Sequence, residues 1–402
     1  MINLDSFKKA KKILDENNVL NPTKLINMPF FSKKVENNIY VKPENLQKIG
    51  AYKIRGAFNF IYNMTDEQKK KGVIAASAGN HAQGVALSAK LLGIKAVIVM
   101  PKGTPLIKVE NVKKYGAEVV LEGNIYDEAY KKAVELQKQY GYVFAHPFND
   151  DAVITGQGTI GLEILDDLPK TNVILVPVGG GGLISGVAMA VKQINPSIKV
   201  IGVEPTNAPS MKEALKNNKL ITIKNVKTIA DGTAVATIGD KTFDYAKKYV
   251  DDIILVDDEE LTDAFITLLN ETKLIAEPSG LLSLAATKKL KYKDKNVVCI
   301  VSGGNIDLIM ISTFLKKGLV INHRILSFDL KLQNKVGELL KVSQILSDLG
   351  ANVIELRHNQ FNNFPAFNDV ELGITVETKN KEHIDSIVAK FKELGYELKI
   401  HN

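Results

Sequence analysis

The sequence contains a single cysteine, Cys299, among its 402 residues. An intrachain disulfide is therefore excluded, and cysteine usage gives no sign of an oxidising compartment. Residues 1–12 carry several lysines but lack the apolar core and the cleavage site of a secretory signal peptide. From these absences we expect a cytoplasmic protein.

Uninterrupted apolar runs, paired histidines and dense basic blocks are also missing. The most apolar stretch, residues 173–191, is interrupted by four glycines and a proline, which favours a buried strand and helix over a membrane span. The six histidines show no metal-binding spacing, so a transition-metal centre has no support. The net charge is +7, but the lysines are spread along helix-like segments. Neither nucleic acid nor a membrane is therefore an expected partner.

Short runs rich in Val and Ile alternate regularly with segments of helical period. The runs are residues 72–77, 95–100, 118–122, 172–178, 199–204, 252–256 and 296–301, and helical patterns lie at 81–92, 126–140 and 183–193. This alternation predicts an α/β fold of parallel sheets with helices on both faces. Because ligands of such folds bind at the carboxyl ends of the strands, the loops that follow strands are the candidate sites.

The pattern changes after Asn322. Strands are expected at residues 323–330, 351–358, 369–378 and 397–400, helices at 335–349 and 383–394, and a loop at 361–368. The order is one βαββαβ unit. We therefore predict a small α+β domain over 323–402, after a larger domain over 1–320. The apolar residues of the first helix should cover one sheet face: Val336, Leu339, Leu340, Val342, Ile345 and Leu346.

Four consecutive glycines, Gly179, Gly180, Gly181 and Gly182, follow the run at 172–178 and open a helix. Without Cβ atoms, successive backbone N–H groups can converge on one anion, and the helix N-terminus adds partial positive charge. No Walker-type lysine follows, which disfavours a nucleoside triphosphate. A merely flexible turn is the alternative, but such turns rarely lie between a core strand and a helix. We predict a phosphate-binding loop.

Two polar turns also follow predicted strands. The turn from Ser77 to His81 could cap the next helix, or its N–H groups could bind a substrate carboxylate. The turn that begins at Ser302 could be a simple turn in which Asn305 caps a helix. Lys53 is a candidate of a different kind from these turns, because this lysine lies in the segment AYKIRGA with few charges beside it. Desolvation there would lower its pKa and make the amine nucleophilic.

Together these segments resemble the fold-type-II pyridoxal phosphate enzymes, and most closely the threonine dehydratases. The resemblance covers the chain from Val41 to about Gly318 and implies two parallel-sheet αβα lobes like those of tryptophan synthase β. The smaller lobe, about residues 50–147, would be inserted within the larger one. The motifs occur in family order: KPENLQ (42–47), YKIRGAF (52–58), SAGNHAQGVA (77–86), VGGGGLISG (178–186), VEP (203–205), DGTAV (231–235), EPSG (277–280) and SGGN (302–305).

The resemblance implies a role for each matched residue. Lys53 would form the Schiff base with pyridoxal 5'-phosphate, Asn80 would contact its ring hydroxyl, and Ser302 its ring nitrogen. The phosphate would be held by Gly179, Gly180, Gly181, Gly182 and the Leu183 backbone. The substrate carboxylate would be surrounded by Ser77, Gly79, Asn80 and His81.

A cation site of the serine racemases is matched by Glu204 and Ala208. Ser210 replaces the third ligand, an Asp. No metal is therefore expected.

The implied reaction is elimination of water and ammonia from L-threonine to give 2-oxobutanoate, with L-serine to pyruvate as a secondary activity. Serine racemase or serine dehydratase is the alternative within the fold. Ala78 stands where the racemases carry a second catalytic serine, which favours a dehydratase. A GNH segment, where cysteine and threonine synthases commonly have GNT, counts against those enzymes. The retained Lys53 and glycine run argue against a non-catalytic amino-acid sensor.

The C-terminal unit resembles an ACT domain, with the segments GANV (350–353) and LRHN (356–359) at its first helix–strand turn. This resemblance implies a homo-oligomer, dimer or tetramer, and regulation by an amino acid or a nucleotide. The alternative is a domain that only assists oligomerisation. Isoleucine biosynthesis and threonine catabolism are both compatible roles.

Overall fold

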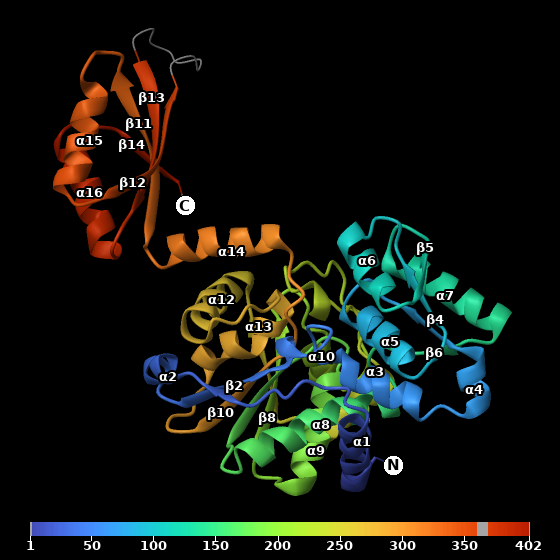
Figure 1. Cartoon of the computed structure of the whole chain (residues 1–402). Helices are drawn as coiled ribbons and strands as arrows, with labels where there is room; N and C mark the ends of the chain where they lie inside the picture. Colours follow the sequence, from blue (N-terminus) through green and yellow to red (C-terminus); the bar gives the residue numbers. More distant parts are fainter. Residues whose placement is uncertain (1, 360–368, 402) are drawn as a thin grey trace. The chain divides into compact units, whose positions relative to one another are not determined.

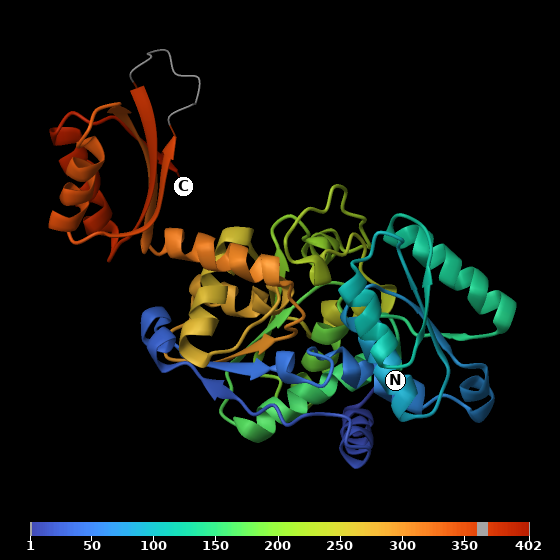
Figure 2. The ribbon, with the colours of Figure 1, turned by 45° about the horizontal axis from the view of Figure 1, so that its top comes forward.

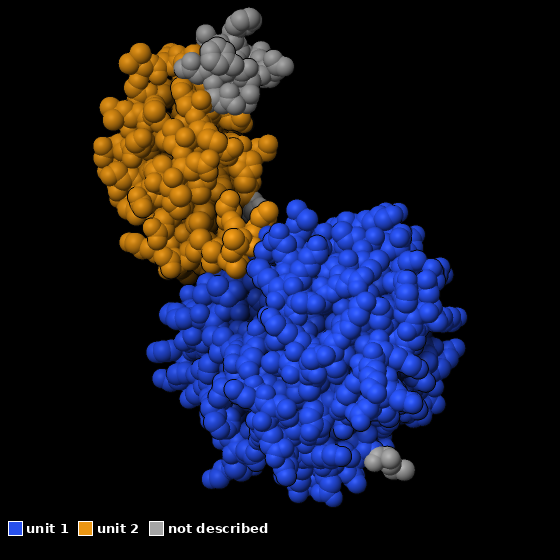
Figure 3. Space-filling model, turned by 45° about the vertical axis from the view of Figure 1, so that its right-hand side comes forward, with its two compact units in different colours: residues 1–307 blue, residues 308–402 orange. Residues whose placement is uncertain are grey.

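The computed structural model describes residues 2–359 and 369–401. The predicted loop at 361–368 lies outside these residues. The chain divides into two compact units, Met1–Asp307 and Leu308–Asn402 (Figure 3). In the described part of the chain, no helix combines the length and apolarity needed to cross a membrane.

The larger sheet of the first unit has six strands in the order β1-β2-β10-β7-β8-β9. All neighbours run parallel except the β1–β2 pair, which is antiparallel. The parallel architecture expected from the sequence is confirmed. The strands are β1 (Ile26–Asn27), β2 (Asn38–Pro43), β7 (Val173–Pro177), β8 (Lys199–Pro205), β9 (Asp252–Val256) and β10 (Asn296–Val301).

Helices cover both faces of this sheet (Figure 1). One face packs against α8 (Asp151–Asp167), α9 (Gly182–Ile194), α10 (Ser210–Asn217) and α11 (Asp240–Tyr249). On the other face lie α12 (Asp258–Thr272) and α13 (Pro278–Ala285). Strands buried on both faces explain why these runs are apolar throughout rather than alternating.

The smaller sheet has the all-parallel order β5-β4-β3-β6. Val73 and Ala75 of β3 face one core with α3, α5 and α6, whereas Ile74 and Ala76 face a second core with α7 (Figure 2). Successive strand residues point to opposite faces, so this sheet is also covered on both sides. The elements are α3 (Lys53–Tyr62), β3 (Val73–Ala76), α5 (Asn80–Leu91), β4 (Ala96–Met100), α6 (Leu106–Lys114), β5 (Glu118–Leu121), α7 (Tyr126–Tyr140) and β6 (Val143–Phe144).

The remaining helices of the first unit are short or peripheral. They are α1 (Leu4–Glu16), α2 (Pro29–Val35), α4 (Asp66–Lys71) and the 3-10 turns η1 (Glu44–Leu46), η2 (Asp231–Thr233) and η3 (Ala286–Lys289).

The second unit contains an antiparallel sheet in the order β12-β13-β11-β14. Its elements are α14 (Leu308–Ile321), β11 (Ile325–Gln333), α15 (Glu338–Asp348), β12 (Asn352–Asn359), β13 (Asp369–Glu377), α16 (Lys381–Glu393) and β14 (Leu398–His401). Residues of α15 and α16 pack on one face of the sheet, which confirms the predicted βαββαβ unit. Three expected core residues are wrong: Val336 precedes α15, and Leu339 and Leu340 are 40% and 72% exposed. The buried residues of this helix are Val342 and Leu346.

Candidate active site

The three predicted turns all lie at carboxyl ends of parallel strands. The Ser77 turn follows β3, the glycine run follows β7, and the Ser302 turn follows β10. Lys53, the first residue of α3, is brought to the Ser302 turn by backbone contacts. The Tyr52 N–H donates to the Ser302 carbonyl (3.1 Å), and Ala51 forms an antiparallel bridge with Gly303. The structure therefore brings Lys53 and Ser302 together, although 249 residues separate them in the sequence.

The amine of Lys53 is half-buried. Its Nζ donates to the Pro147 carbonyl (2.8 Å) and lies 5.3 Å from the centroid of the Tyr52 ring. Burial lowers the pKa of Lys53 to about 8, although the charge of Glu277 opposes this change. A larger fraction of this amine is therefore unprotonated near neutral pH than for an ordinary lysine. The desolvation expected from the sequence is confirmed.

The glycine run forms a tight loop at the start of α9. Gly181 has a left-handed φ of +93°, and the Thr242 hydroxyl donates to the Gly180 carbonyl (2.7 Å). A Cβ on Gly180 would lie 2.3 Å from the Phe148 ring, and one on Gly182 would lie 2.9 Å from the Phe148 Cα. The loop thus requires glycine. The N–H groups of the first turn of α9 have no partner within the helix, which is the arrangement that binds anions.

One short segment, between β6 and α8, joins Lys53 to the glycine loop. Pro147 accepts the hydrogen bond from Lys53, and the next residue, Phe148, packs against the glycines. The segment is held by His146, whose Nδ1 accepts from the N–H groups of Phe148 (3.3 Å) and Asn149 (2.9 Å). Burial lowers the pKa of His146 to about 4, so its ring stays neutral and can accept. No role was predicted for this segment from the sequence, although its consecutive residues His146, Pro147 and Phe148 could have drawn attention to it.

Asn80 is held in one orientation by two side chains. Its Nδ2 donates to Glu277 Oε1 (2.7 Å), and its Oδ1 accepts from Asn305 Nδ2 (2.7 Å). An amide nitrogen carries two hydrogens, so one N–H of Asn80 remains for a ligand. Burial raises the pKa of Glu277 to about 7, and Asp231 adds to this effect. Glu277 belongs to the EPSG motif of the sequence analysis, but no role was predicted for it.

The Ser77 turn offers backbone N–H groups as well as polar side chains. The Gly79 N–H donates to the Ser77 hydroxyl (3.2 Å), and neither Ser77 nor Asn80 caps α5. His81 Nε2 lies 2.8 Å from the Ala145 carbonyl oxygen, which can only accept, so this nitrogen carries the hydrogen. Burial lowers the pKa of His81 to about 3, and its buried Nδ1 has no partner among the described residues. The imidazole therefore has no free N–H for a carboxylate.

The candidate cation ligand Glu204 has a structural function instead. Its carboxylate accepts from the N–H groups of Met211 (2.7 Å) and Lys212 (2.9 Å), and so fixes the start of α10. Burial raises the pKa of Glu204 to about 7. Ala208 is buried, and its N–H donates to the Pro205 carbonyl. In the described ranges, no group of three or more His, Cys, Asp or Glu side chains could hold a metal ion.

These residues fit pyridoxal phosphate. The glycine loop excludes Cβ atoms where a phosphate would contact backbone N–H groups. Lys53 supplies a partly desolvated amine, and Ser302 a neutral hydroxyl that is 4% exposed. Both belong to turns that the Tyr52–Ser302 hydrogen bond joins.

Comparisons with known proteins agree with this geometry. The family described as pyridoxal-phosphate dependent enzyme matches residues 17–303. An L-threonine ammonia-lyase from Thermotoga maritima is 45% identical over 401 residues and 100% of both chains. One from Geobacter sulfurreducens is 43% identical over 376 residues, 93% of this chain and 94% of the relative.

Solved structures give the same fold. The processed form of threonine deaminase isoform 2 from Solanum lycopersicum has a TM-score of 0.75 and 39% identity, covering 80% of this chain and 90% of its own. Maize serine racemase has a TM-score of 0.74 and 39% identity, covering 80% and 99%. These neighbours confirm the predicted fold class, and the family confirms the predicted cofactor. The chain belongs to the pyridoxal-phosphate-dependent enzyme family.

Proposed function

We propose that the protein is an L-threonine ammonia-lyase that converts L-threonine to 2-oxobutanoate and ammonia, and L-serine more slowly to pyruvate. The observation that carries this proposal is the 45% identity, over the whole of both chains, to the Thermotoga maritima L-threonine ammonia-lyase. The site described above would supply an amine, an anion-binding loop and a carboxylate-binding turn. A pyridoxal-phosphate-dependent lyase that acts on an amino acid uses these three features.

Lys53 would hold the cofactor through its amine, and the backbone of Gly179, Gly180, Gly181, Gly182 and Leu183 would hold the phosphate. The free N–H of Asn80 would meet the ring hydroxyl, and the Ser302 hydroxyl would meet the ring nitrogen. When bound, pyridoxal phosphate supplies an electron sink that stabilises negative charge at the substrate Cα. A neutral hydroxyl at the ring nitrogen weakens that sink compared with a carboxylate, which favours prompt loss of the β-hydroxyl over a long-lived carbanion.

The chain itself would bind the substrate and move the proton. The backbone N–H groups of the Ser77–His81 turn, at the start of α5, would bind the substrate carboxylate. Once the substrate amine has released it from the cofactor, Lys53 would take the Cα proton, because its lowered pKa of about 8 favours unprotonated amine near neutral pH. His81 would contribute backbone rather than imidazole, since its ring hydrogen is bonded to Ala145.

The test is the initial rate of 2-oxo acid formation from L-threonine and L-serine by cofactor-saturated protein. We expect 2-oxobutanoate from threonine at a higher kcat/KM than pyruvate from serine. A protein that binds the cofactor and yet forms no 2-oxobutanoate would contradict the proposal.

Serine racemisation is the second candidate, since maize serine racemase shares the fold at 39% identity. The residue that favours elimination is Ala78, which lies in the turn between β3 and α5 and has no proton to donate. Chiral analysis of the serine left during turnover should show little D-serine. Rapid accumulation of D-serine would favour the racemase.

We also propose that residues 323–402 regulate the enzyme and supply no catalytic residue. The support is that every residue placed in the site precedes Leu308, and that the second unit has its own buried core. Homo-oligomer formation, and an amino-acid or nucleotide effector, follow from its ACT-like pattern. A chain that ends before His323 should still turn over threonine but lose any response to isoleucine, valine or AMP. Full effector sensitivity in that chain would place the regulatory site in the first unit.

A further inference from the structure

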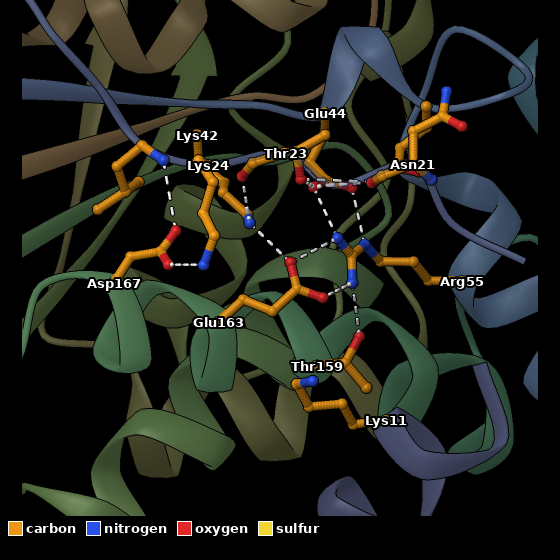
Figure 4. Close-up of polar contacts among 12 residues, drawn as sticks. Lys11, Asn21, Thr23, Lys24, Lys42, Glu44, Arg55, Thr159, Glu163 and Asp167 are labelled. Carbon is orange, nitrogen blue, oxygen red and sulfur yellow. Dashed lines mark hydrogen bonds and ion pairs between the residues drawn. The ribbon is translucent and has the colours of Figure 1, made fainter. Parts of the chain in front are cut away.

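Four charged side chains lie together beside α3 (Figure 4). They are Lys42 from β2, Glu44 from η1, Arg55 from α3 and Glu163 from α8. The first three are at most 2% exposed and Glu163 is 18% exposed. Two of the residues lie in the KPENLQ motif, to which the proposed function gives no role.

The guanidinium of Arg55 uses all five of its N–H donors. Nε and Nη2 donate to the two oxygens of Glu44 (2.7 and 2.8 Å). Nη1 and Nη2 donate to the two oxygens of Glu163 (2.6 and 2.9 Å), and Nη1 also donates to the Thr159 hydroxyl (3.1 Å). Two bidentate pairs fix both the position and the rotation of a planar group.

Lys42 completes the charge balance. Its Nζ donates to Glu163 Oε2 (2.6 Å) and to the Thr23 carbonyl (2.6 Å). The cluster therefore holds two cations and two carboxylates and has no net charge. Replacing such a cluster by well-packed apolar side chains is often neutral or stabilising. Stability alone therefore does not explain it, and a fixed geometry is what it adds.

Arg55 follows Lys53 by two residues on the same helical turn. At 3.6 residues per turn, the two side chains point about 200° apart around the helix axis. The guanidinium is therefore held by η1 and α8 while the amine points to the active site. Any rotation of the first turn of α3 that moved Lys53 would break the bonds of Arg55.

Close backbone contacts prevent this turn from shifting in other directions. A Cβ on Gly84 of α5 would lie 3.2 Å from the Lys53 carbonyl oxygen. A Cβ on Gly156 of α8 would lie 2.5 Å from the Arg55 carbonyl oxygen. Helices α5 and α8 thus restrict translation of the turn, and the cluster sets its rotation.

We propose that Arg55, held by Glu44 and Glu163, is a positioning residue that sets where the Lys53 amine lies. This inference rests on the proposed function only for its kinetic readout. A misplacement of about 1 Å at a reacting group can cost about 100-fold in rate.

The experiment separates position from stability by restoring charge balance without the guanidinium. Arg55→Met alone leaves one excess buried carboxylate and should lower the thermal midpoint. Glu44→Gln/Arg55→Met leaves Lys42 with Glu163 and should recover most of that midpoint. We expect the double variant to keep kcat for threonine about 10- to 100-fold below wild type, with KM within about threefold. Its amide hydrogens at residues 53–58 should exchange at least about tenfold faster, measured on cofactor-free chain.

Two further variants make the result decisive. Arg55→Lys keeps the charge but loses the bidentate geometry, so it should fold and show the same faster exchange. Ile160→Ala, a matched control in the core on α8, should lower the midpoint without changing exchange at residues 53–58. Wild-type exchange in both Arg55→Lys and the double variant would overturn the proposal, as would recovery of kcat together with the midpoint. If wild-type protein fails to turn over threonine, the proposed function fails, and the exchange comparison still tests Arg55.

Discussion

The two sides of the first turn of α3 treat charge in opposite ways. On one side, carboxylates accept four of the five N–H donors of Arg55 and the Thr159 hydroxyl accepts the fifth, and the pKa of Arg55 stays above its ordinary value because Glu44 and Glu163 outweigh burial. On the other side, the Lys53 amine faces a carbonyl oxygen and an aromatic ring, and burial lowers its pKa to about 8. A cation that is paired with carboxylates stays charged and fixes the structure around it. A buried amine without an ion-pair partner loses its proton more easily.

The buried carboxylates of the two sides differ in the same way. Burial alone would raise the pKa of Glu163, but Arg55 and Lys42 hold it at about 2. The pKa of Glu277, beside Asn80, is instead raised to about 7 by burial and Asp231. One carboxylate is therefore ionised across the physiological range, and the other titrates within it.

The largest expected effect comes from removing the uncompensated amine. Lys53→Ala should reduce 2-oxobutanoate formation to the background rate and abolish the visible absorption of the bound cofactor, because no other residue supplies the amine. Stability should change little, since no carboxylate of the described residues forms an ion pair with Lys53 and the charge of Glu277 only partly opposes the effect of burial. Rate assays and an absorption scan measure both effects. Lys138→Ala, on the exposed side of α7, is the control, and near wild-type turnover by Lys53→Ala would refute the assignment.

The second effect tests the anion-binding loop. In Gly180→Ala, the new Cβ would lie 2.3 Å from the Phe148 ring, so the loop must move away from the geometry that binds phosphate. We expect cofactor affinity to fall at least about tenfold, which is about 1.4 kcal/mol, as measured by absorption titration. Gly103→Ala is the matched control, because a Cβ there has nothing within 4 Å. Equal affinities for the two variants would show that the loop does not hold the phosphate.

The third effect tests the compensated side through stability. Because the folded-state pKa of Glu163 is about 2 and its ordinary value 4.5, its contribution is present above pH 4.5 and is lost as the pH falls towards 2. Glu163→Gln should therefore lower the free energy of unfolding by about 3 kcal/mol at pH 7. The deficit should shrink below pH 4.5 in denaturant titrations. A deficit independent of pH would mean that packing, rather than charge, is lost.

The smallest expected effect is again on the free energy of unfolding, and its sign is opposite to that of Glu163→Gln. The folded-state pKa of Glu277 is about 7 and its ordinary value 4.5, so the folded chain binds one more proton than the unfolded chain between these pH values. Stability is therefore lost as the pH rises through this window. Relative to wild type, Glu277→Gln should gain about 1–2 kcal/mol between pH 4.5 and 7. The same titrations on Glu135→Gln, at an exposed position, should show no change in stability. A loss of stability in Glu277→Gln would contradict a raised pKa of Glu277.

The local sequence pattern predicted those elements whose helical period or apolar run is complete within one segment. The expected helix at 126–140 and the strands at 252–256 and 296–301 coincide with α7, β9 and β10. Strand β2 was not predicted, because only three consecutive residues in it are apolar, Ile39 to Val41, and Lys42 and Pro43 follow them. So short an apolar run gives little local signal for a strand.

The site was predictable where a residue acts through its own backbone or burial. The glycine loop and the lowered pKa of Lys53 are of this kind. Glu277 and His81 are not, because their states depend on Asn80 and Ala145, which are 197 and 64 residues away. The roles of the individual site residues towards the cofactor stay predictions until the variants above are measured.

The contact between Phe148 and the glycine loop also constrains how this enzyme can vary. Gly180 and Gly182 both lack room for a Cβ because the same phenylalanine occupies it. At position 180 a methyl group can enter the loop only if position 148 becomes smaller in the same lineage, whereas at position 182 it would also meet the backbone of residue 148. Either change alone passes through a chain with a clash or a void beside the phosphate-binding backbone. Substitutions at positions 148 and 180 should therefore be correlated among descendants of this sequence.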